Sequence, residues 1–192
     1  MLLLGIYGSP RKGGNTDLML EAFLDGATSA GADVRRLYVR DLEIRGCIAC
    51  GYCDKAGECI TKDGMSQVYP LLEEAAGIVV ASPIYFYGVT GQLKLLIDRS
   101  QALFMKRELA RASGAGALEE KSKKGFLLCA GATKGKRMFE CAALTVRYFL
   151  DALGAAEGGE ICVSKLDEKG SILARPEVLE DCRNAGARFA VG

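Results

Sequence analysis

The chain has 192 residues, of which 49% are hydrophobic, and its 25 lysines and arginines nearly balance 24 aspartates and glutamates. This length and apolar content suit a single domain with one core. Because the two charge signs are mixed along the chain, no strong field favours nucleic acid or an anionic membrane, so the expected partner is a small molecule or another protein. The absence of histidine excludes Ser-His-Asp and Cys-His hydrolases and every zinc site that needs imidazole.

The chain begins with an apolar stretch, residues 2–8, that lacks a basic leader and a cleavage-site pattern and soon reaches turn residues. We interpret this stretch as a strand rather than a signal peptide. No apolar run approaches the roughly 18 residues that cross a bilayer. A soluble, cytoplasmic protein is therefore expected.

Short apolar runs bounded by glycine or turn residues predict strands that are buried on both faces of a parallel sheet. The runs at 2–8, 77–82 and 125–131 are expected to be central strands. The more polar run at 33–41 is expected at the edge of the sheet, and 159–164 is a weaker fifth strand.

Between these runs, apolar residues recur at helical spacing and predict five helices. Strand and helix thus alternate five times, which predicts one α/β domain over residues 1–192, a three-layer sandwich with a five-stranded parallel sheet in the order 2-1-3-4-5. Residues 105–124, charged and with a Gly-Ala centre, predict an exposed insertion, either a flexible loop or a subunit contact. The periodic positions are Leu20, Leu24 and Ala27; Val68, Leu71 and Leu72; Leu93, Leu96 and Ile97; Phe139, Ala142, Val146, Phe149 and Leu153; and Val178, Cys182, Ala185 and Phe189.

The loops that follow the strands of such a sheet meet at one edge, where ligands bind. The first of these loops, "GSPRKGGNT" at residues 8–16, has the glycine spacing of a nucleotide-binding P-loop but lacks its Lys and Ser or Thr, and it also lacks GxGxxG. Its glycine-rich turn leads into a helix start with free N–H groups, which is typical of a phosphate cradle. Alternatively, Asn15 or Thr16 merely caps the helix.

Two further loops could enclose a ligand beside this cradle. Loop 82–91 carries an aromatic run that could wall a flat ring, although packing or a subunit interface uses aromatic residues as well. Loop 130–136 could close the other side. The residues concerned are Pro83, Tyr85, Phe86 and Tyr87, then Gly88, which is expected to open the next helix, and Gly131 and Thr133.

Three stretches in this order, "GSPRKGGNT", "CIACGYCDKAGECITKDGM" and "SPIYFYGVTGQLKLLIDRS", resemble the NADPH-dependent FMN reductase group of flavodoxin-like proteins and, within it, the iron-sulfur flavoproteins. The resemblance is strong over residues 1–100 and rests on the strand-helix pattern beyond them. It implies bound FMN and a homodimer or homotetramer with flavin sites near subunit contacts. It also implies an FMN phosphate on Ser9, Arg11, Asn15 and Thr16 and an isoalloxazine ring against Pro83, Ile84, Tyr85 and Phe86.

Two details of this resemblance concern single residues. Gly64 stands where the family commonly has a second acidic residue, before the methionine that matches Met65, and the change is expected to affect the start of the second helix more than the chemistry. Asp98 and Arg99 also resemble family residues. Their simplest meaning is an ion pair on a helix surface, worth under about 1 kcal/mol.

Four of the eight cysteines lie within residues 47–59 with the spacing C-x2-C-x2-C-x5-C. Consecutive C-x2-C steps resemble the run that wraps a four-iron cluster in bacterial ferredoxins, whereas structural zinc usually takes two separated pairs. Because the chain has no second run, Cys59 is expected to complete the set formed by Cys47, Cys50 and Cys53. A loop of free thiols, a Cys47–Cys50 disulfide and zinc are the alternatives. The remaining cysteines are interpreted as small core residues: Cys129, Cys141, Cys162 and Cys182.

The leading hypothesis is an FMN-dependent electron-transfer oxidoreductase in which a four-iron four-sulfur cluster, near the flavin at the same sheet edge, couples FMN to one-electron partners. Electrons would arrive as a hydride from NAD(P)H or singly from a ferredoxin-like donor. No catalytic side chain is required, because the cofactor carries the chemistry. One alternative is a cluster-free NAD(P)H-dependent FMN or quinone reductase, and a second is a non-catalytic, metal-held docking module.

Overall fold

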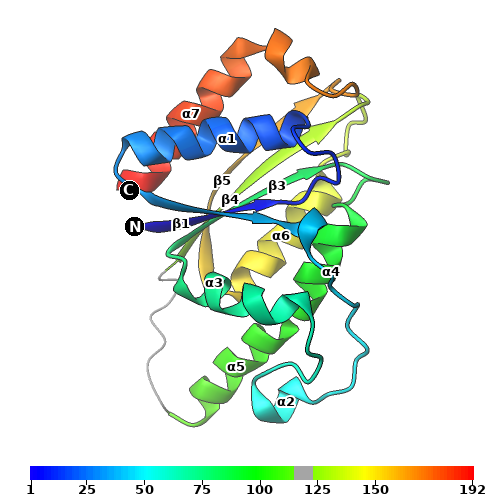
Figure 1. Cartoon of the computed structure of the whole chain (residues 1–192), viewed down its shortest axis with the longest axis vertical. Helices are drawn as coiled ribbons and strands as arrows, with labels where there is room; N and C mark the ends of the chain where they lie inside the picture. Colours follow the sequence, from blue (N-terminus) through cyan, green and yellow to red (C-terminus); the bar gives the residue numbers. More distant parts are fainter. Residues whose placement is uncertain (115–122) are drawn as a thin grey trace.

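A computed structural model describes residues 1–114 and 123–192 (Figure 1). Within these residues, five strands form one sheet in the order β2-β1-β3-β4-β5, and every neighbouring pair is parallel. The predicted flavodoxin-like order is therefore confirmed, with the polar β2 at an edge. The strands are β1 Leu2–Tyr7, β2 Asp33–Tyr38, β3 Gly77–Pro83, β4 Lys123–Gly131 and β5 Ala155–Ser164.

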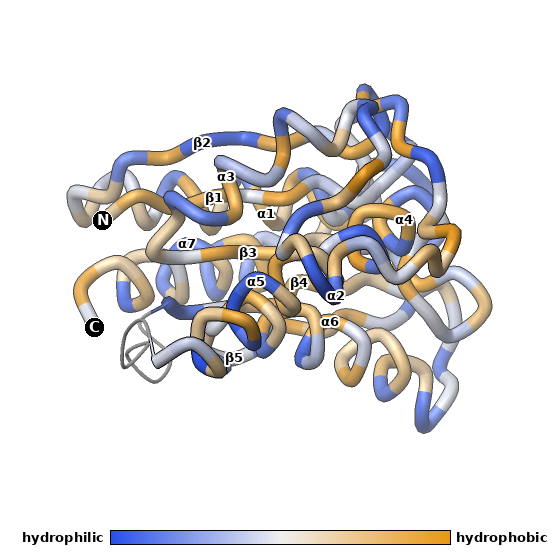
Figure 2. Tube along the Cα trace, turned by 90° about the horizontal axis from the view of Figure 1, so that it is seen from below, coloured by the Kyte–Doolittle hydropathy of each residue, from blue (hydrophilic) through white to orange (hydrophobic). Residues whose placement is uncertain are grey.

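Helices cover both faces of this sheet (Figure 1). Successive side chains of a strand point to opposite faces, so Leu3 and Tyr7 pack in the core under α1 and α7, whereas Leu4 and Ile6 pack in the core under α3, α4 and α6. Figure 2 shows hydrophobic residues along β3 between the layers and a largely hydrophilic β2. The helices are α1 Asn15–Ser29, α2 Cys53–Ala56, α3 Val68–Glu74, α4 Gly91–Arg99, α5 Gln101–Ala112, α6 Glu140–Ala152 and α7 Pro176–Val191, with 3-10 turns η1 Val39–Asp41, η2 Gly64–Gln67 and η3 Ser171–Ala174.

The helices α1 and α7 cross with their backbones in direct contact. A Cβ placed on Gly26 would lie 1.9 Å from the carbonyl oxygen of Arg183, and a Cβ on Gly186 would lie 1.9 Å from that of Phe23. Glycine is thus required on both helices at the crossing. This contact fixes α7 against α1, whose first turn borders the site described below.

The segment expected as an exposed insertion is in part helical. Residues 105–112 belong to α5, because Ala102 and Leu103 anchor the start of that helix in the core and good helix formers follow them. Residues 115–122 of the same segment lie outside the described residues. Among the described helices, none combines the length and the apolar character that crossing a membrane would require.

The cysteines outside the cysteine-rich segment differ in burial. Cys129 and Cys182 are buried, as predicted, but Cys162 is half-buried and Cys141 is exposed. The interpretation of Cys141 as a core residue is wrong because the buried stripe of α6 runs through Ala142 and Val146, and Cys141 lies beside that stripe.

Candidate functional site

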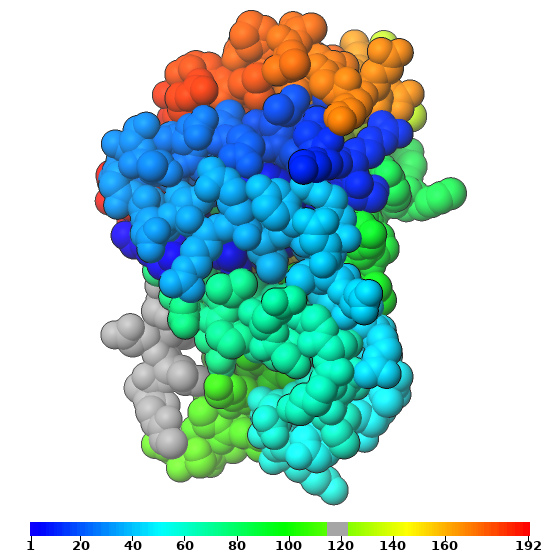
Figure 3. Space-filling view, viewed as in Figure 1, coloured from blue at the N-terminus to red at the C-terminus, as the bar shows by residue number. Residues whose placement is uncertain are grey.

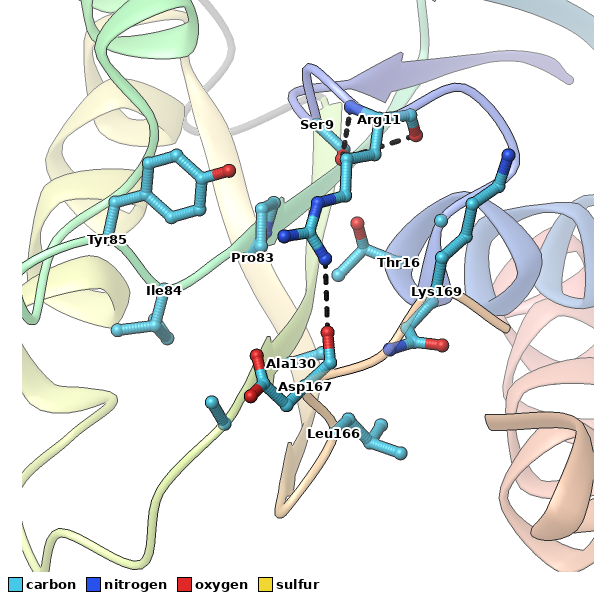
Figure 4. A pocket seen from close by; sticks show the side chains of 13 residues that line it. Ser9, Arg11, Thr16, Pro83, Ile84, Tyr85, Ala130, Leu166, Asp167 and Lys169 are labelled. Carbon is cyan, nitrogen blue, oxygen red and sulfur yellow. Dashed lines mark hydrogen bonds between the residues drawn. The ribbon is translucent and has the colours of Figure 1, made fainter. Parts of the chain in front are cut away.

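A pocket opens at the carboxyl edge of the sheet, among the loops that follow β1, β3, β4 and β5 (Figure 4). It brings together residues of the first loop and residues of the third loop that the sequence places far apart. Ser9 and Tyr85 therefore lie in one site. The lining consists of Ser9, Arg11, Gly14, Asn15, Thr16, Pro83, Ile84, Tyr85, Ala130, Ala132, Leu166, Asp167 and Lys169.

The glycine-rich loop (residues 8–16) enters α1 without a side-chain cap. The capping position is Gly14, with an extended backbone, and no side chain accepts a hydrogen bond there. Asn15 and Thr16 are already helical, so the alternative that one of them caps the helix is wrong. The first-turn N–H groups of a helix have no intrahelical partner and carry partial positive charge. This end of the pocket therefore suits an anion.

A buried ion pair between Asp17 and Arg40 holds the backbone of the glycine-rich loop. Asp17 Oδ2 accepts hydrogen bonds from Gly13 N at 2.9 Å and from Arg40 Nη1 at 3.1 Å, and the same Nη1 donates to Ser9 O at 3.1 Å. Burial raises the pKa of Asp17, and the Gly13 N–H and Arg40 oppose that rise. These bonds fix the backbone of the loop before any ligand binds.

Asn15 joins the glycine-rich loop to the segment that follows β5, the β5 loop (residues 165–172). Its Nδ2 donates to Glu168 O at 2.9 Å and to Ser171 Oγ at 3.2 Å, and its Oδ1 accepts from Ile172 N at 3.2 Å. Both amide hydrogens and the amide oxygen are thus engaged within the protein. Asn15 lies at the pocket, but its side chain holds the β5 loop in place.

Arg11 spans the pocket. Its Nη1 donates to Asp167 O at 3.0 Å, the bond drawn as a dashed line at the centre of Figure 4. Sequence reasoning missed the wall on which this bond ends, formed by Leu166, Asp167 and Lys169. The sheet topology could have predicted this wall, because the loop after the fifth parallel strand must reach the same edge of the sheet as the loops after the other four strands.

The third loop supplies an apolar wall but turns back sooner than predicted. Tyr85 and Gly88 exchange backbone hydrogen bonds, each 2.9 Å long, across Phe86 and Tyr87, whose φ values are 48° and 64°. This is the geometry of a type I′ hairpin turn. Phe86 is fully exposed at its tip and does not line the pocket. Gly88 closes the turn, and the next helix begins at Gly91 rather than at Gly88.

The fourth loop contributes small side chains rather than the predicted ones. Ala130 and Ala132 line the pocket, whereas Gly131 and Thr133 do not. Gly131 O instead accepts a hydrogen bond from Leu166 N at 3.0 Å, which ties the fourth loop to the β5 loop.

The cysteine loop (residues 46–62) carries its four thiols on an exposed surface. Cys47 and Cys50 are exposed, Cys53 and Cys59 are half-buried, and all four are free, so the Cys47–Cys50 disulfide is not formed. In residues 1–114 and 123–192, no three metal-ligating side chains are gathered closely enough to hold a metal ion. Four thiols are the right donors for an iron-sulfur cluster, but in this structure they are not gathered around one point.

Cys53 and Cys59 have different electrostatic surroundings. Burial and the Asp54 carboxylate raise the pKa of the Cys53 thiol. Burial also acts to raise the pKa of the Cys59 thiol, but the Thr61 N–H and the Arg99 guanidinium outweigh it, and that pKa is lowered. Cys59 is thus the more readily ionised of the two.

A buried guanidinium ties the two ends of the cysteine loop together. Arg99, 2% exposed, donates from Nη1 to Arg45 O at 2.8 Å and from Nη2 to Thr61 O at 3.0 Å. It also pairs with Asp63 at 2.7 and 3.2 Å, and Asp63 accepts further bonds from Arg45 N and Met65 N. Arg99 therefore closes the base of the loop.

The expectation of an Asp98–Arg99 surface pair is wrong. Asp98 is exposed and pairs with Lys94 one helical turn away, at 2.6 Å, while Arg99 points inward to Asp63. Adjacent residues on a helix face different directions, so they cannot share one surface pair. Gly64 begins η2 directly after this carboxylate, and a Cβ there would lie 2.8 Å from Glu43 O, which leaves no room for an acidic side chain.

The cysteine loop and the pocket occupy separate places. No residue of 46–62 lines the pocket, and α2 packs against α5. Figure 3 shows the cysteine loop, in cyan, at the end of the molecule opposite α7, in orange and red. The described residues of the cysteine loop therefore do not contribute to the lining of the pocket.

Comparisons with known proteins agree with this architecture. The family described as NADPH-dependent FMN reductase matches residues 1–166. An iron-sulfur flavoprotein of Archaeoglobus fulgidus is 40% identical over 99 residues, which are 52% of this chain and 45% of that protein. The iron-sulfur flavoprotein MJ1083 of Methanocaldococcus jannaschii is 35% identical over 125 residues, 65% of each chain. The chain thus spans about half to two thirds of these relatives.

A solved structure reproduces the fold over its full length. The FMN-dependent NADH-azoreductase of Bacillus anthracis, in complex with FMN, covers 99% of this chain and 100% of its own with a TM-score of 0.72. The two sequences are only 12% identical, so this likeness concerns the fold alone.

Proposed function

The chain belongs to the NADPH-dependent FMN reductase family, and from this premise we propose that it is a flavin-dependent oxidoreductase that binds FMN in the pocket at the carboxyl edge of the sheet. One observation carries the proposal: the uncapped start of α1 and an apolar wall face the same pocket. A phosphate suits the first of these, and a flat ring suits the second.

The two ends of the pocket would bind different parts of FMN, the phosphate at one end and the ring at the other. Ser9, Thr16 and the first-turn N–H groups of α1 would hold the phosphate, and Arg11 would add charge. Pro83, Ile84 and Tyr85 would orient the ring and exclude water from one face. Bound FMN supplies both one-electron and two-electron chemistry. No side chain of the pocket is asked to act as a base.

A flavin titration tests this assignment. The quenching of flavin fluorescence should show that the chain binds FMN at least about 10-fold more tightly than riboflavin, which lacks the phosphate and its charge-assisted hydrogen bonds. Anaerobic addition of NADPH or NADH to the complex then identifies the donor by loss of the oxidised-flavin absorbance. A chain that binds neither flavin, or both equally, contradicts the proposal.

For the cysteine loop we propose a four-iron four-sulfur cluster held by Cys47, Cys50, Cys53 and Cys59. The spacing of the four residues and the names of the relatives support it. Binding would require the loop to draw its thiols together, because they are not gathered in this structure. The proposed outer partners are a small-molecule or ferredoxin-like donor and acceptor.

Metal analysis after anaerobic reconstitution tests the cluster. The wild-type chain should bind about four irons and four acid-labile sulfides per protomer. Cys50→Ser should lose most of this iron, while Cys141→Ser, which removes an exposed thiol outside the loop, should keep it. Equal iron contents in the two variants, or none in the wild type, would contradict cluster binding.

The cluster-free NAD(P)H-dependent reductase is the second candidate. Two observations favour it: no three of the four thiols are gathered closely enough to hold a metal ion, and no residue of the loop lines the pocket. Its signature would be a flavin that NADPH reduces at the same rate in the wild type and in Cys50→Ser.

We also propose a homodimer or homotetramer. Phe86, Leu144 and Tyr148 are large apolar side chains exposed on the surface, and such residues commonly mark contacts between subunits. Sedimentation equilibrium at micromolar concentration measures the assembly directly. A strict monomer would rule this proposal out.

A further inference from the structure

Hydrogen bonds from two side chains, those of Asn15 and Arg11, hold the β5 loop against the glycine-rich loop. Asn15 commits its whole amide group to Glu168, Ser171 and Ile172, and Arg11 adds the bond to Asp167 O. On its other side, Leu166 N donates to Gly131 O at 3.0 Å. The β5 loop is therefore fixed as a fourth side of the pocket.

Lys169 extends from this fixed loop over the glycine-rich loop. A Cβ placed on Gly13 would lie 3.8 Å from Lys169 Cε, and Figure 4 shows the lysine side chain rising beside Thr16 toward that loop. In the part of the chain that the structure describes, neither Lys169 nor Arg11 forms an ion pair with a carboxylate. Lys169 thus lines the pocket beside the glycine-rich loop, and its amino group has no carboxylate partner among the described residues.

The charges at this end are suited to a doubly charged anion. Two cationic side chains and one carboxylate, that of Asp167, line the pocket. The start of α1 adds roughly half a positive charge. A phosphate monoester carries about 1.5 to 2 negative charges at neutral pH, so a single arginine would leave much of that charge uncompensated.

We propose that the β5 loop is the fourth wall of the FMN site and that Lys169 contacts the FMN phosphate, with Asn15 as the positioning residue that holds Lys169 in place. This inference rests on the proposed function. It gives Asn15 a positioning role, whereas the family resemblance implies that Asn15 binds the phosphate. The family match ends at residue 166, so Lys169 and most of this wall lie just beyond it.

Affinities for FMN and riboflavin, measured on matched charge variants, test the contact. Lys169→Gln should weaken FMN binding by about 10-fold, because a charge-assisted hydrogen bond is lost, and should leave riboflavin binding within twofold. The control is Lys136→Gln, which removes an exposed lysine near the same edge that does not line the pocket. It should change neither affinity.

The positioning role of Asn15 requires a separate readout. Asn15→Ala should weaken FMN binding, and in its background Lys169→Gln should cost far less than 10-fold, because the lysine is no longer held in place. Full additivity of the two substitutions would overturn the positioning role.

The outcomes separate the two proposals. If the wild type binds FMN tightly and Lys169→Gln binds it equally well, the lysine contact is wrong and the proposed function stands. If Lys169→Gln weakens FMN and riboflavin equally, the lysine acts through the fold, and the phosphate contact is again wrong. If the wild type binds no flavin, both proposals fail.

Discussion

Arg99 is the single residue on which the cysteine loop most depends. Arg99→Met should lower the free energy of unfolding by about 3–5 kcal/mol, because it leaves the Asp63 carboxylate buried without its cation. The matched control is the adjacent Asp98→Asn, which breaks only the exposed pair with Lys94 and should cost under about 1 kcal/mol. Urea unfolding of the three proteins measures both effects. Similar costs for the two variants would contradict the anchoring role of Arg99.

Because of the same ion pair, the free energy of unfolding should depend on pH in the acidic range. Burial alone would raise the pKa of Asp63, but the bonds from Arg99 and two backbone N–H groups lower it from 3.8 to about 2. A lowered pKa means that the carboxylate stabilises the fold above about pH 4 and that this contribution, about 2 kcal/mol, is lost as the pH falls to about 2.

Measurements of the unfolding free energy between pH 6 and pH 2 test the direction of this pH dependence. The advantage of the wild type over Asp63→Asn should be constant above about pH 4 and should shrink toward pH 2. Parallel pH profiles for the two proteins would show that Asp63 has the same pKa in the folded and unfolded states.

At the scale of elements, the crossing of α1 and α7 is the most sensitive contact. Gly186→Ala should destabilise the protein by at least about 2 kcal/mol, because the methyl group would overlap the Phe23 carbonyl and force the helices apart. Asn184→Ala, on the exposed face of the same helix, should change stability by less than about 0.5 kcal/mol. Thermal melts of both variants decide the matter, and an unchanged melting temperature for Gly186→Ala would refute the close contact.

The elements also show what the sequence could reveal. Apolar runs predicted the three central strands, because a central parallel strand is buried on both faces, and the polar character of 33–41 predicted its place at the edge. The return of the third loop at Phe86 and Tyr87 could not be predicted, since type I′ turns usually use Asn and Gly. The inward direction of Arg99 depends on Asp63, 36 residues earlier, and such long-range pairing leaves no local pattern.

At the scale of the whole molecule, parallel topology explains why the pocket was largely foreseeable. Ser9, Thr16 and Tyr85 were identified because loops after parallel strands meet at one edge. Lys169 was not predicted, because the loop that follows the fifth strand was not among the four loops expected at this edge. The course of the cysteine loop was not foreseeable, since its contact with α5 depends on tertiary packing rather than on sheet topology.

The separation of the two regions leads to a prediction for the whole molecule. Because the cysteine loop and the pocket share no lining residue, Cys50→Ser should leave the FMN affinity unchanged within about twofold. Fluorescence titration of both proteins measures this. A large loss of affinity in Cys50→Ser would mean that the loop reaches a flavin site, for example that of a neighbouring subunit.

The anchoring of the cysteine loop by one side chain has a consequence for its length. Arg99 joins the carbonyl groups of Arg45 and Thr61, so the span between them is a loop closed at its base by one side chain, with α2 as its contact with α5. Closing a ring of twice the contour adds only about 0.6 kcal/mol of entropy. Insertions between these two tether points should therefore be tolerated far better than any substitution at the tether itself.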